Sequence, residues 1–346
     1  MINQVVYDVF IRGKEKAKHE QGLRGTNRFK GDLDAFTKKG LRFSYTNKLG
    51  EQKQEYDFTD TYHVVGNLVC SPRFCCTAED NWFGFVMLSN DLKEMVIVFR
   101  GTETRKEWIE NFTLFMEYLP GEREVSRFSL CGNRQKLMCH AGCKHLYTQR
   151  SVQGIESPKE TIYRLIEEHK SRLDSVTVVG QSLGGAMSQL CAVDLAHANV
   201  LGEIPILAIS WASPKVGNKC LAEWVDKMHP RLRVLRIKGS NDRITTMPPD
   251  WLWRLLTGGF KHMGTEIVLD NEHLQAEGVV KSNAGYIPNH SFQMYLHNID
   301  PTRDVALMNK VSCVIPDTYC EKHTISTYWH HRTRTGKAWP RTIFDD

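Results

Sequence analysis

The stretch VTVVGQSLGGAMSQL, residues 176–190, constrains the fold more than any other part of the chain. It begins with β-branched and apolar residues, which are typical of a short buried strand. It continues into Gly185–Ala198, whose residues are almost all apolar, as in a buried helix. Between the two lies Gly180-Gln181-Ser182-Leu183-Gly184, which fits the pattern G-x-S-x-G. The stretch therefore predicts a strand over Val176–Val179, a tight turn and a buried helix.

Other apolar segments also alternate between strand and helix patterns. We predict strands over Trp82–Leu88, Glu94–Phe99, Ile206–Trp211, Arg233–Ile237 and Thr265–Leu269, and helices over Lys106–Tyr118, Pro158–Lys170 and Leu221–His229. Such alternation predicts an α/β fold with a mainly parallel sheet and helices on both faces. We expect one α/β domain over 61–346, including a C-terminal tail, after a polar segment, 1–60, whose structure the sequence does not define.

Composition and charge narrow the class of protein. The 346 residues are 41% hydrophobic and 25% charged, which is typical of a soluble globular protein, and the apolar runs are too short to span a membrane. The first residues lack the apolar core of a signal peptide and carry acids, unlike a transit peptide, so we expect a cytoplasmic protein. The chain has no continuous stripe of Lys and Arg, so we expect no nucleic-acid partner. Its net charge of +5 is compatible with contact to an anionic membrane surface.

The ten cysteines do not indicate a metal centre. Without a secretory signal, reduced thiols are expected. The segment Cys139–His145 has the spacing C-H-x-x-C-x-H, which matches no usual zinc pattern. We therefore expect no metal ion.

Ser182 has two interpretations. In α/β-hydrolases the nucleophile lies on a sharp turn from strand to helix, with small residues at the two glycine positions. Gly180 and Gly184 fit this requirement, and the following helix would direct its N-terminus at an anion. The alternative is a buried structural turn without chemistry.

A nucleophilic serine needs a base and an acid that orients the base. Asp242 follows the strand Arg233–Ile237, where this fold places its site, and Asp250 is its nearest rival. Asp242 could equally be a turn or helix-cap residue.

The candidate bases before residue 300 are His262, His273, His290 and His297. Position alone separates His290 from the others only weakly.

An oxyanion needs hydrogen-bond donors. The N–H of Leu183 follows the nucleophile, and a second donor is expected from the junction in VIVFRGTET, where Thr102 offers an N–H and a hydroxyl. Thr102 could also cap the predicted helix from Lys106 onward.

Taken together, these segments resemble the class 3 (fungal-type) lipases, and most closely their plant phospholipase A1 branch. The resemblance covers about Tyr62 to Lys310, with the motifs in order. The matching segments are FRGTETRKEWIENF, CHAGCKHLYT, VTVVGQSLGGAMSQLCAVDLA, WASPKVGNKCLAEWV, LRVLRIKGSNDRITTMPP, KHMGTEIVLD, HSFQMYLHNID and RDVALMNK.

The resemblance implies a catalytic triad of Ser182, Asp242 and His290, with Leu183 and Thr102 as the oxyanion hole. It is the resemblance, not the spacing, that favours His290 over His297. Two positions depart from the family pattern, because Gln181 replaces a usual His and Gln293 a usual Glu. The Trp- and Leu-rich N-terminal segment of the family is not recognisable in residues 1–60.

The implied activity is hydrolysis of a lipid ester without a metal or organic cofactor. A phospholipase A1 that cleaves the sn-1 ester of glycerophospholipids is the first choice. A galactolipase or an acylglycerol lipase with the same triad is the alternative, and a lipase-like scaffold without activity is an alternative of another class. Two apolar segments, marked by Trp108 and Phe112 and by Trp251 and Trp253, could form a lid or an interfacial anchor, or ordinary core helices.

Overall fold

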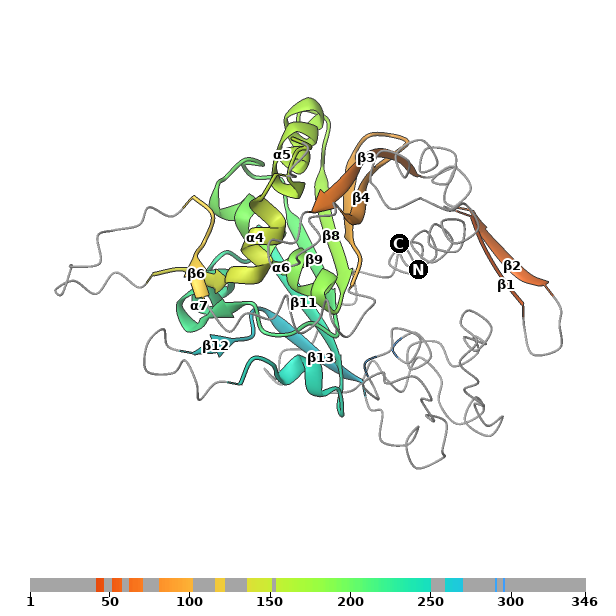
Figure 1. The fold of residues 1–346 in the computed structure, drawn as a ribbon. Coiled ribbons are helices and arrows are strands. Elements are labelled where there is room, and N and C mark those ends of the chain that lie inside the picture. The colour runs from red at the N-terminus through yellow and green to blue at the C-terminus, as the bar shows by residue number, and fades with distance from the viewer. Residues whose placement is uncertain are drawn as a thin grey trace.

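A central sheet of seven strands organises the protein (Figure 1). The computed structural model describes residues 42–46, 52–57, 62–70, 81–101, 116–121, 136–150, 154–249, 259–269, 290 and 295. The strands lie in the order β13-β11-β9-β8-β5-β4-β3. Their bounds are β3 Tyr62–Cys70, β4 Asn81–Ser89, β5 Glu94–Phe99, β8 Ser175–Gln181, β9 Ile206–Trp211, β11 Leu232–Gly239 and β13 Thr265–Leu269.

Five neighbouring strands of this sheet are parallel. β5, β8, β9, β11 and β13 pair in parallel, whereas β3 and β4 pair antiparallel at one edge. β4 and β5 are joined by a tight turn in which the N–H of Leu92 donates to the carbonyl of Ser89 at 2.8 Å. A turn that short can join only antiparallel strands, while parallel strands need a long crossover. The prediction of an α/β fold with a mainly parallel sheet is confirmed.

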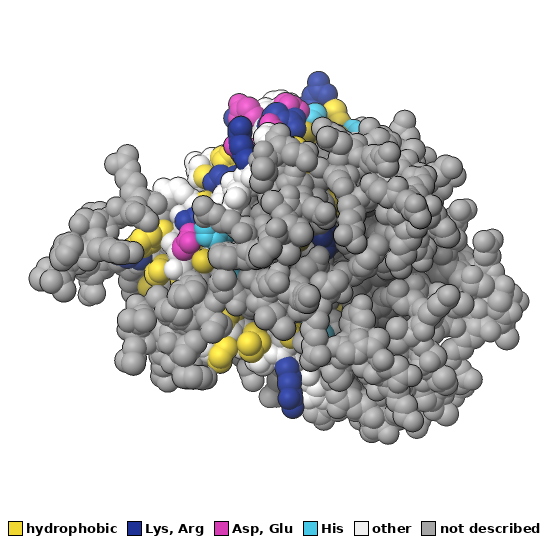
Figure 2. Space-filling model, in the orientation of Figure 1, with side chains coloured by type: hydrophobic (Ala, Val, Ile, Leu, Met, Phe, Trp, Pro, Cys, Tyr) yellow, Lys and Arg dark blue, Asp and Glu magenta, His cyan; other side chains and the backbone are white. Residues whose placement is uncertain are grey.

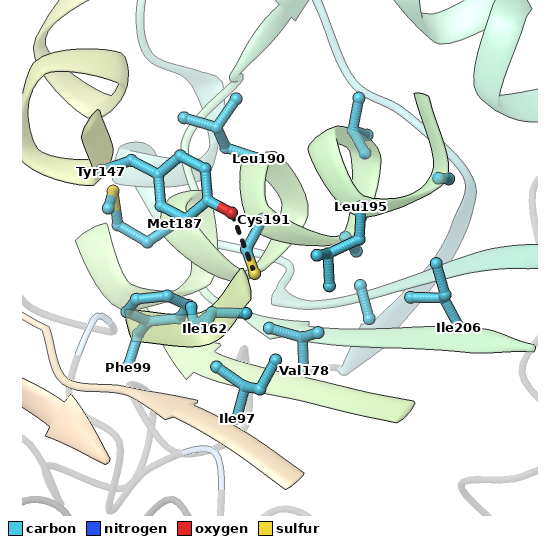
Figure 3. Close-up of a cluster of buried hydrophobic side chains, with 14 of the residues drawn as sticks. Ile97, Phe99, Tyr147, Ile162, Val178, Met187, Leu190, Cys191, Leu195 and Ile206 are labelled. Carbon is cyan, nitrogen blue, oxygen red and sulfur yellow. Dashed lines mark hydrogen bonds between the residues drawn. The ribbon is translucent and has the colours of Figure 1, made fainter. Parts of the chain in front are cut away.

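Helix α6, Leu183–His197, packs against β8 and β9 in the middle of the sheet and contributes more side chains to the larger core than any other described element. Its side chains pack with Ile97, Val178 and Ile206 of the strands, as Figure 3 shows. Helices α4, Ala141–Thr148, α5, Pro158–His169, and α7, Lys219–Lys227, contribute to the same core. A helix that is apolar all round must be buried, and α6 is covered by the sheet on one side and by neighbouring helices on another.

Side chains of the parallel strands alternate between two cores. Ile206 and Ala208 of β9 face the helices just described, whereas Ile209 and Trp211 pack with a second cluster formed by Ala212, Leu235, Ile237, Leu269 and Tyr295. Tyr295 is itself helical and completely buried. The structure therefore describes several helices on one face of the sheet. On the other face, the described helical residue is Tyr295.

The outer surface of α5 is charged. Arg164 pairs with Glu156 and Glu168, and Lys170 pairs with Glu167. Figure 2 shows Lys, Arg, Asp and Glu side chains gathered at the top of the molecule, where Figure 1 places α5. Ile162 and Leu165 lie buried on the opposite side of the helix, as its sequence pattern predicts.

One helix prediction is wrong at its end. Met116–Tyr118 forms strand β6, not the last turn of a helix over Lys106–Tyr118, because it pairs antiparallel with β7, Met138–His140. Residues 106–115 lie outside the described part of the chain. With β10, Gly217–Asn218, and β12, Phe260–Lys261, these strands form a small second sheet that the sequence did not predict.

Within the predicted N-terminal segment, 1–60, the structure describes one antiparallel pair, β1, Arg42–Thr46, and β2, Gln52–Asp57. The proposed division of the chain at residue 60 stays a prediction. Among the helices in the described ranges, none combines the length and the apolar character needed to cross a bilayer.

Candidate active site

Ser182 lies on a strained turn between β8 and α6. Its backbone has φ +58° and ψ −122°, a combination that non-glycine residues rarely adopt. The turn is held because the N–H of Ser182 donates to the carbonyl of Trp211, at the end of β9, at 2.9 Å. Strain of this kind persists only where the surrounding structure enforces it, and it is concentrated at functional sites.

The glycines on both sides of Ser182 are required by close backbone contacts. A Cβ at Gly180 would lie 2.0 Å from the carbonyl oxygen of Gly184. A Cβ at Gly184 would lie 2.5 Å from the carbonyl oxygens of Phe99 and Arg100. Both distances are far inside van der Waals contact, so the turn accepts only glycine at these two positions without shifting its backbone.

The turn places Ser182 next to hydrogen-bond donors of the main chain. Leu183 is the first residue of α6, and the first N–H groups of a helix have no acceptor within the helix. The helix N-terminus therefore favours negative charge beside the Ser182 hydroxyl. Thr102, the second predicted donor, lies outside the described residues, which end here at Gly101.

Asp242 lies three residues beyond the end of β11. Its carboxylate is almost completely buried. Oδ1 accepts a hydrogen bond from the N–H of Ile244 at 3.0 Å, and this contact caps the short 3-10 helix Arg243–Thr246. Both interpretations of Asp242 thus hold geometrically, because it caps this helix and also faces His290. Its rival Asp250 lies outside the described residues.

His290 connects the serine to the aspartate. Its Nδ1 lies 2.9 Å from Oδ2 of Asp242, and its Nε2 lies 2.8 Å from Oγ of Ser182. The structure therefore brings together the three residues named from the sequence. In this arrangement the imidazole can accept the serine proton while the carboxylate orients the ring and stabilises its charged form.

His262 does not take part in this arrangement. Its Nε2 lies 2.7 Å from the carbonyl oxygen of Thr245, so this nitrogen is engaged outside the series of Ser182, His290 and Asp242. Burial, assisted by nearby Arg236, lowers the pKa of His262 to about 2, so the ring is neutral at physiological pH. The remaining candidate bases, His273 and His297, lie outside the described residues.

Two residues that the sequence did not single out for the site contact the triad. The hydroxyl of Tyr295 donates to Oδ2 of Asp242 at 2.6 Å and accepts from the N–H of Gly239 at 2.8 Å. The side-chain amide of Gln181 donates to the carbonyl oxygen of His290 at 3.1 Å. The departure of Gln181 from the family pattern was a signal in the sequence, but its contact was not predictable.

Most of the segment Cys139–His145 is buried, and only Lys144 and His145 are partly exposed. Cys139 and Cys143 are buried, and burial raises the pKa of Cys143 to about 12, so its thiol stays protonated. In the described ranges, no group of three or more His, Cys, Asp or Glu side chains could hold a metal ion. The apolar candidates Trp108, Phe112, Trp251 and Trp253 lie outside those ranges.

Comparison with known proteins identifies relatives across most of the chain. The family model described as lipase (class 3) matches residues 96–251. Phospholipase A1-II 4 of Oryza sativa subsp. japonica is 26% identical over 76% of this chain and 70% of its own length. Galactolipase DONGLE, chloroplastic, of Arabidopsis thaliana is 27% identical over 75% of this chain and 61% of its own length.

Among solved structures, the triacylglyceride lipase of Rhizomucor miehei aligns with a TM-score of 0.42 and 22% identity. The alignment covers 61% of this chain and 68% of that lipase. The chain spans less than two thirds of the length of several of these curated relatives, including the galactolipase.

Proposed function

Because the chain belongs to the class 3 lipase family, in its plant phospholipase A1 branch, we propose that it is a serine hydrolase of lipid carboxylic esters. The observation that carries this proposal is the hydrogen-bonded series from Ser182 through His290 to Asp242, with contacts of 2.8 and 2.9 Å. All three side chains are buried or nearly so, which keeps water from competing for the hydrogen bonds.

In the proposed reaction, His290 Nε2 takes the proton of Ser182 as Oγ attacks the ester carbonyl. Asp242 accepts the hydrogen bond of Nδ1–H and stabilises the imidazolium. The proton then passes from His290 to the leaving alcohol oxygen, and an acyl-serine remains. Water, deprotonated by His290, attacks this ester, the proton passes from His290 to Ser182 Oγ, and the fatty acid is released. The steps require neither a metal ion nor an organic cofactor.

The negative charge of the tetrahedral intermediate needs donors that are already in place. The N–H of Leu183 and a donor of Thr102 are proposed to form this oxyanion hole. Removing one such donor typically raises the barrier by about 3 to 4 kcal/mol. The start of α6 at Leu183, directly beside the serine, supports the first of these assignments.

The first candidate substrate is a glycerophospholipid cleaved at its sn-1 ester, as the names of relatives such as the rice phospholipase A1-II 4 suggest. A galactolipid is the second candidate, and the galactolipase relative favours it. Neutral acylglycerols would need the same chemistry. A lipase-like scaffold without activity is the hypothesis of another class, and the complete triad geometry speaks against it.

The proposed enzyme meets its substrate at a membrane or micelle surface. Trp108 and Phe112, or Trp251 and Trp253, would make this peripheral contact, either as part of a lid that opens at the lipid surface or as an interfacial anchor. We propose the cytoplasm as its compartment, although the Arabidopsis relative is named as chloroplastic. Imaging of the tagged full-length protein in living cells would distinguish the two compartments.

The substrate is tested with separate detergent-mixed micelles of phosphatidylcholine, galactolipid and diacylglycerol. Phosphatidylcholine with different acyl chains at sn-1 and sn-2 shows which ester is cleaved. We expect release of the sn-1 acid by the wild type and no release by Ser182→Ala. Release from another lipid would keep the mechanism and change the substrate, whereas no release from any of them would favour the scaffold.

A further inference from the structure

We propose that Gln181 is a positioning residue, whose side-chain amide holds the main chain of His290 where the imidazole reaches Ser182. This inference rests on the proposed hydrolase function. It assigns a role to the residue that directly precedes the candidate nucleophile. The amide contacts the main-chain carbonyl of His290, so its effect would be exerted through His290.

Gln181 is well placed to act as a fixed support. It is the last residue of β8 and is only 4% exposed. Its neighbour in the sheet is Trp211 of β9, whose carbonyl also holds the N–H of Ser182. The Gln181 side chain therefore extends from backbone that is fixed by sheet pairing on one side and by the strained turn on the other.

The consecutive residues Gln181 and Ser182 hold His290 at two different points. The amide Nε2 of Gln181 donates to the His290 carbonyl oxygen at 3.1 Å, and Oγ of Ser182 lies 2.8 Å from the ring Nε2. One contact fixes the main chain and the other involves the ring. The distance between nucleophile and base thus depends on the short segment that carries both contacts.

A main-chain support matters because the described strand that precedes His290 ends well before it in the sequence. The last residue of β13 is Leu269, more than twenty residues earlier. Asp242 contacts the ring through Nδ1, whereas the Gln181 amide contacts the main chain. A displacement of about 1 Å between reacting groups can lower a rate by roughly 10²-fold. The amide is also uncharged, so it adds no charge beside the imidazolium.

The decisive variant is Gln181→Met, which retains the size and burial of the side chain and lacks a donor. We expect kcat on a soluble chromogenic butyrate ester to fall about 10- to 100-fold, with KM changed less than about threefold. The second-order rate of labelling by a fluorophosphonate should fall by a similar factor. Gln181→His restores an N–H donor and should recover most of both rates.

The matched control is Gln189→Met. Gln189 is also a buried glutamine, and its amide donates to the hydroxyls of Ser210 and Ser213. This variant loses hydrogen bonds without touching His290, so it should lower Tm and leave kcat within about twofold. If Gln181→Met does not fold, Gln181→Leu, which is also apolar and lacks a hydrogen-bond donor, serves in its place.

Three results would overturn the proposal. If Gln181→Met hydrolyses and labels at wild-type rates, the role of Gln181 is excluded while the hydrolase function stands. If Gln189→Met loses as much kcat as Gln181→Met, the effect is general destabilisation. If the wild type neither hydrolyses the ester nor becomes labelled, the proposed function itself fails, and the role of Gln181 fails with it.

Discussion

The hydroxyl of Tyr295 donates a 2.6 Å hydrogen bond to Oδ2 of Asp242, the oxygen that also faces His290. Burial, with the nearby Asp242 charge, raises the pKa of Tyr295 well above its usual value, so the hydroxyl stays a donor at any physiological pH. The same hydroxyl accepts from the N–H of Gly239 at the end of β11. Tyr295 therefore connects the Asp242 carboxylate to the C-terminal end of strand β11.

Tyr295→Phe should reduce both catalysis and stability. The variant removes a hydrogen bond to a charged group, which is worth about 1.5–3 kcal/mol, and deprives the Gly239 N–H of its acceptor. We expect kcat/KM on a soluble ester to fall about tenfold or more, together with a lower Tm. Steady-state kinetics and thermal unfolding of the purified protein measure the two effects.

The matched control for this prediction is Tyr147→Phe. Tyr147 is also completely buried and donates to Asp194 on α6, so the change is the same but lies outside the triad. This variant should lose stability and retain kcat/KM. An equal loss of kcat/KM in both variants would show that Tyr295 has no special relation to Asp242.

Asp242→Asn tests the orientation of the base. The amide retains the size of the carboxylate but cannot stabilise the imidazolium, and it favours the wrong tautomer of His290. In serine triads this exchange lowers kcat by about 10⁴-fold. We expect a loss of that order with little change in KM, measured on the soluble ester. A loss smaller than about tenfold would argue against Asp242 as the orienting acid.

Gly184→Ala tests the packing of the turn against β5. The new Cβ would meet the carbonyl oxygens of Phe99 and Arg100, which are backbone atoms and cannot rotate away. We expect the free energy of unfolding to fall by about 1–3 kcal/mol and kcat to fall with it, as urea titration and ester kinetics would show.

Gly202→Ala provides the comparison for this variant. Gly202 has φ +58°, and an added Cβ there would have no described atom within 4 Å. The substitution costs about 1 kcal/mol of backbone strain, but it lies beyond the other end of α6 and should leave kcat unchanged. Equal effects of the two variants on kcat would contradict the packing argument.

His262 makes stability depend on pH. Its pKa is about 2 in the folded protein and about 6.5 in the unfolded chain, so below pH 6.5 only the unfolded chain takes up the proton. The resulting contribution to stability is complete above pH 6.5 and is lost as the pH falls. At pH 5 it is reduced by roughly 2 kcal/mol relative to pH 7.

His262→Gln removes this titration and retains a donor for the carbonyl of Thr245. Urea unfolding at pH 7 and at pH 5 should therefore show a smaller loss of stability in the variant than in the wild type, by roughly 2 kcal/mol. Parallel losses in the two proteins would show that His262 is not the group responsible.

The local sequence pattern around Ser182 was sufficient to predict the strand before it and the helix after it. The apolar run before Gly180 and the apolar helix after Gly184 reappear as β8 and α6, with ends shifted by about two residues. The parallel sheet followed from the alternation of elements. The small sheet that includes β6 and β7 was not predictable, because its strands are two or three residues long and depend on partners distant in sequence.

The choice among the histidines shows where local patterns stop being informative. Nothing in the spacing of His262 or His290 reveals that one ring faces Thr245 and the other faces Ser182. That difference arises from how residues more than a hundred positions apart are brought together by the sheet. For the same reason, nothing in the segment HSFQMYLH predicts that Tyr295 donates a hydrogen bond to Asp242.

The central claim is that Ser182 is an activated nucleophile, and covalent trapping tests it most directly. The full chain is incubated with a fluorophosphonate, and the adduct is located by mass spectrometry of its peptides. We predict one adduct on Ser182, none at this position in Ser182→Ala, and much slower formation in His290→Ala. An unlabelled Ser182 in the folded protein, or equal labelling of His290→Ala, would contradict the account.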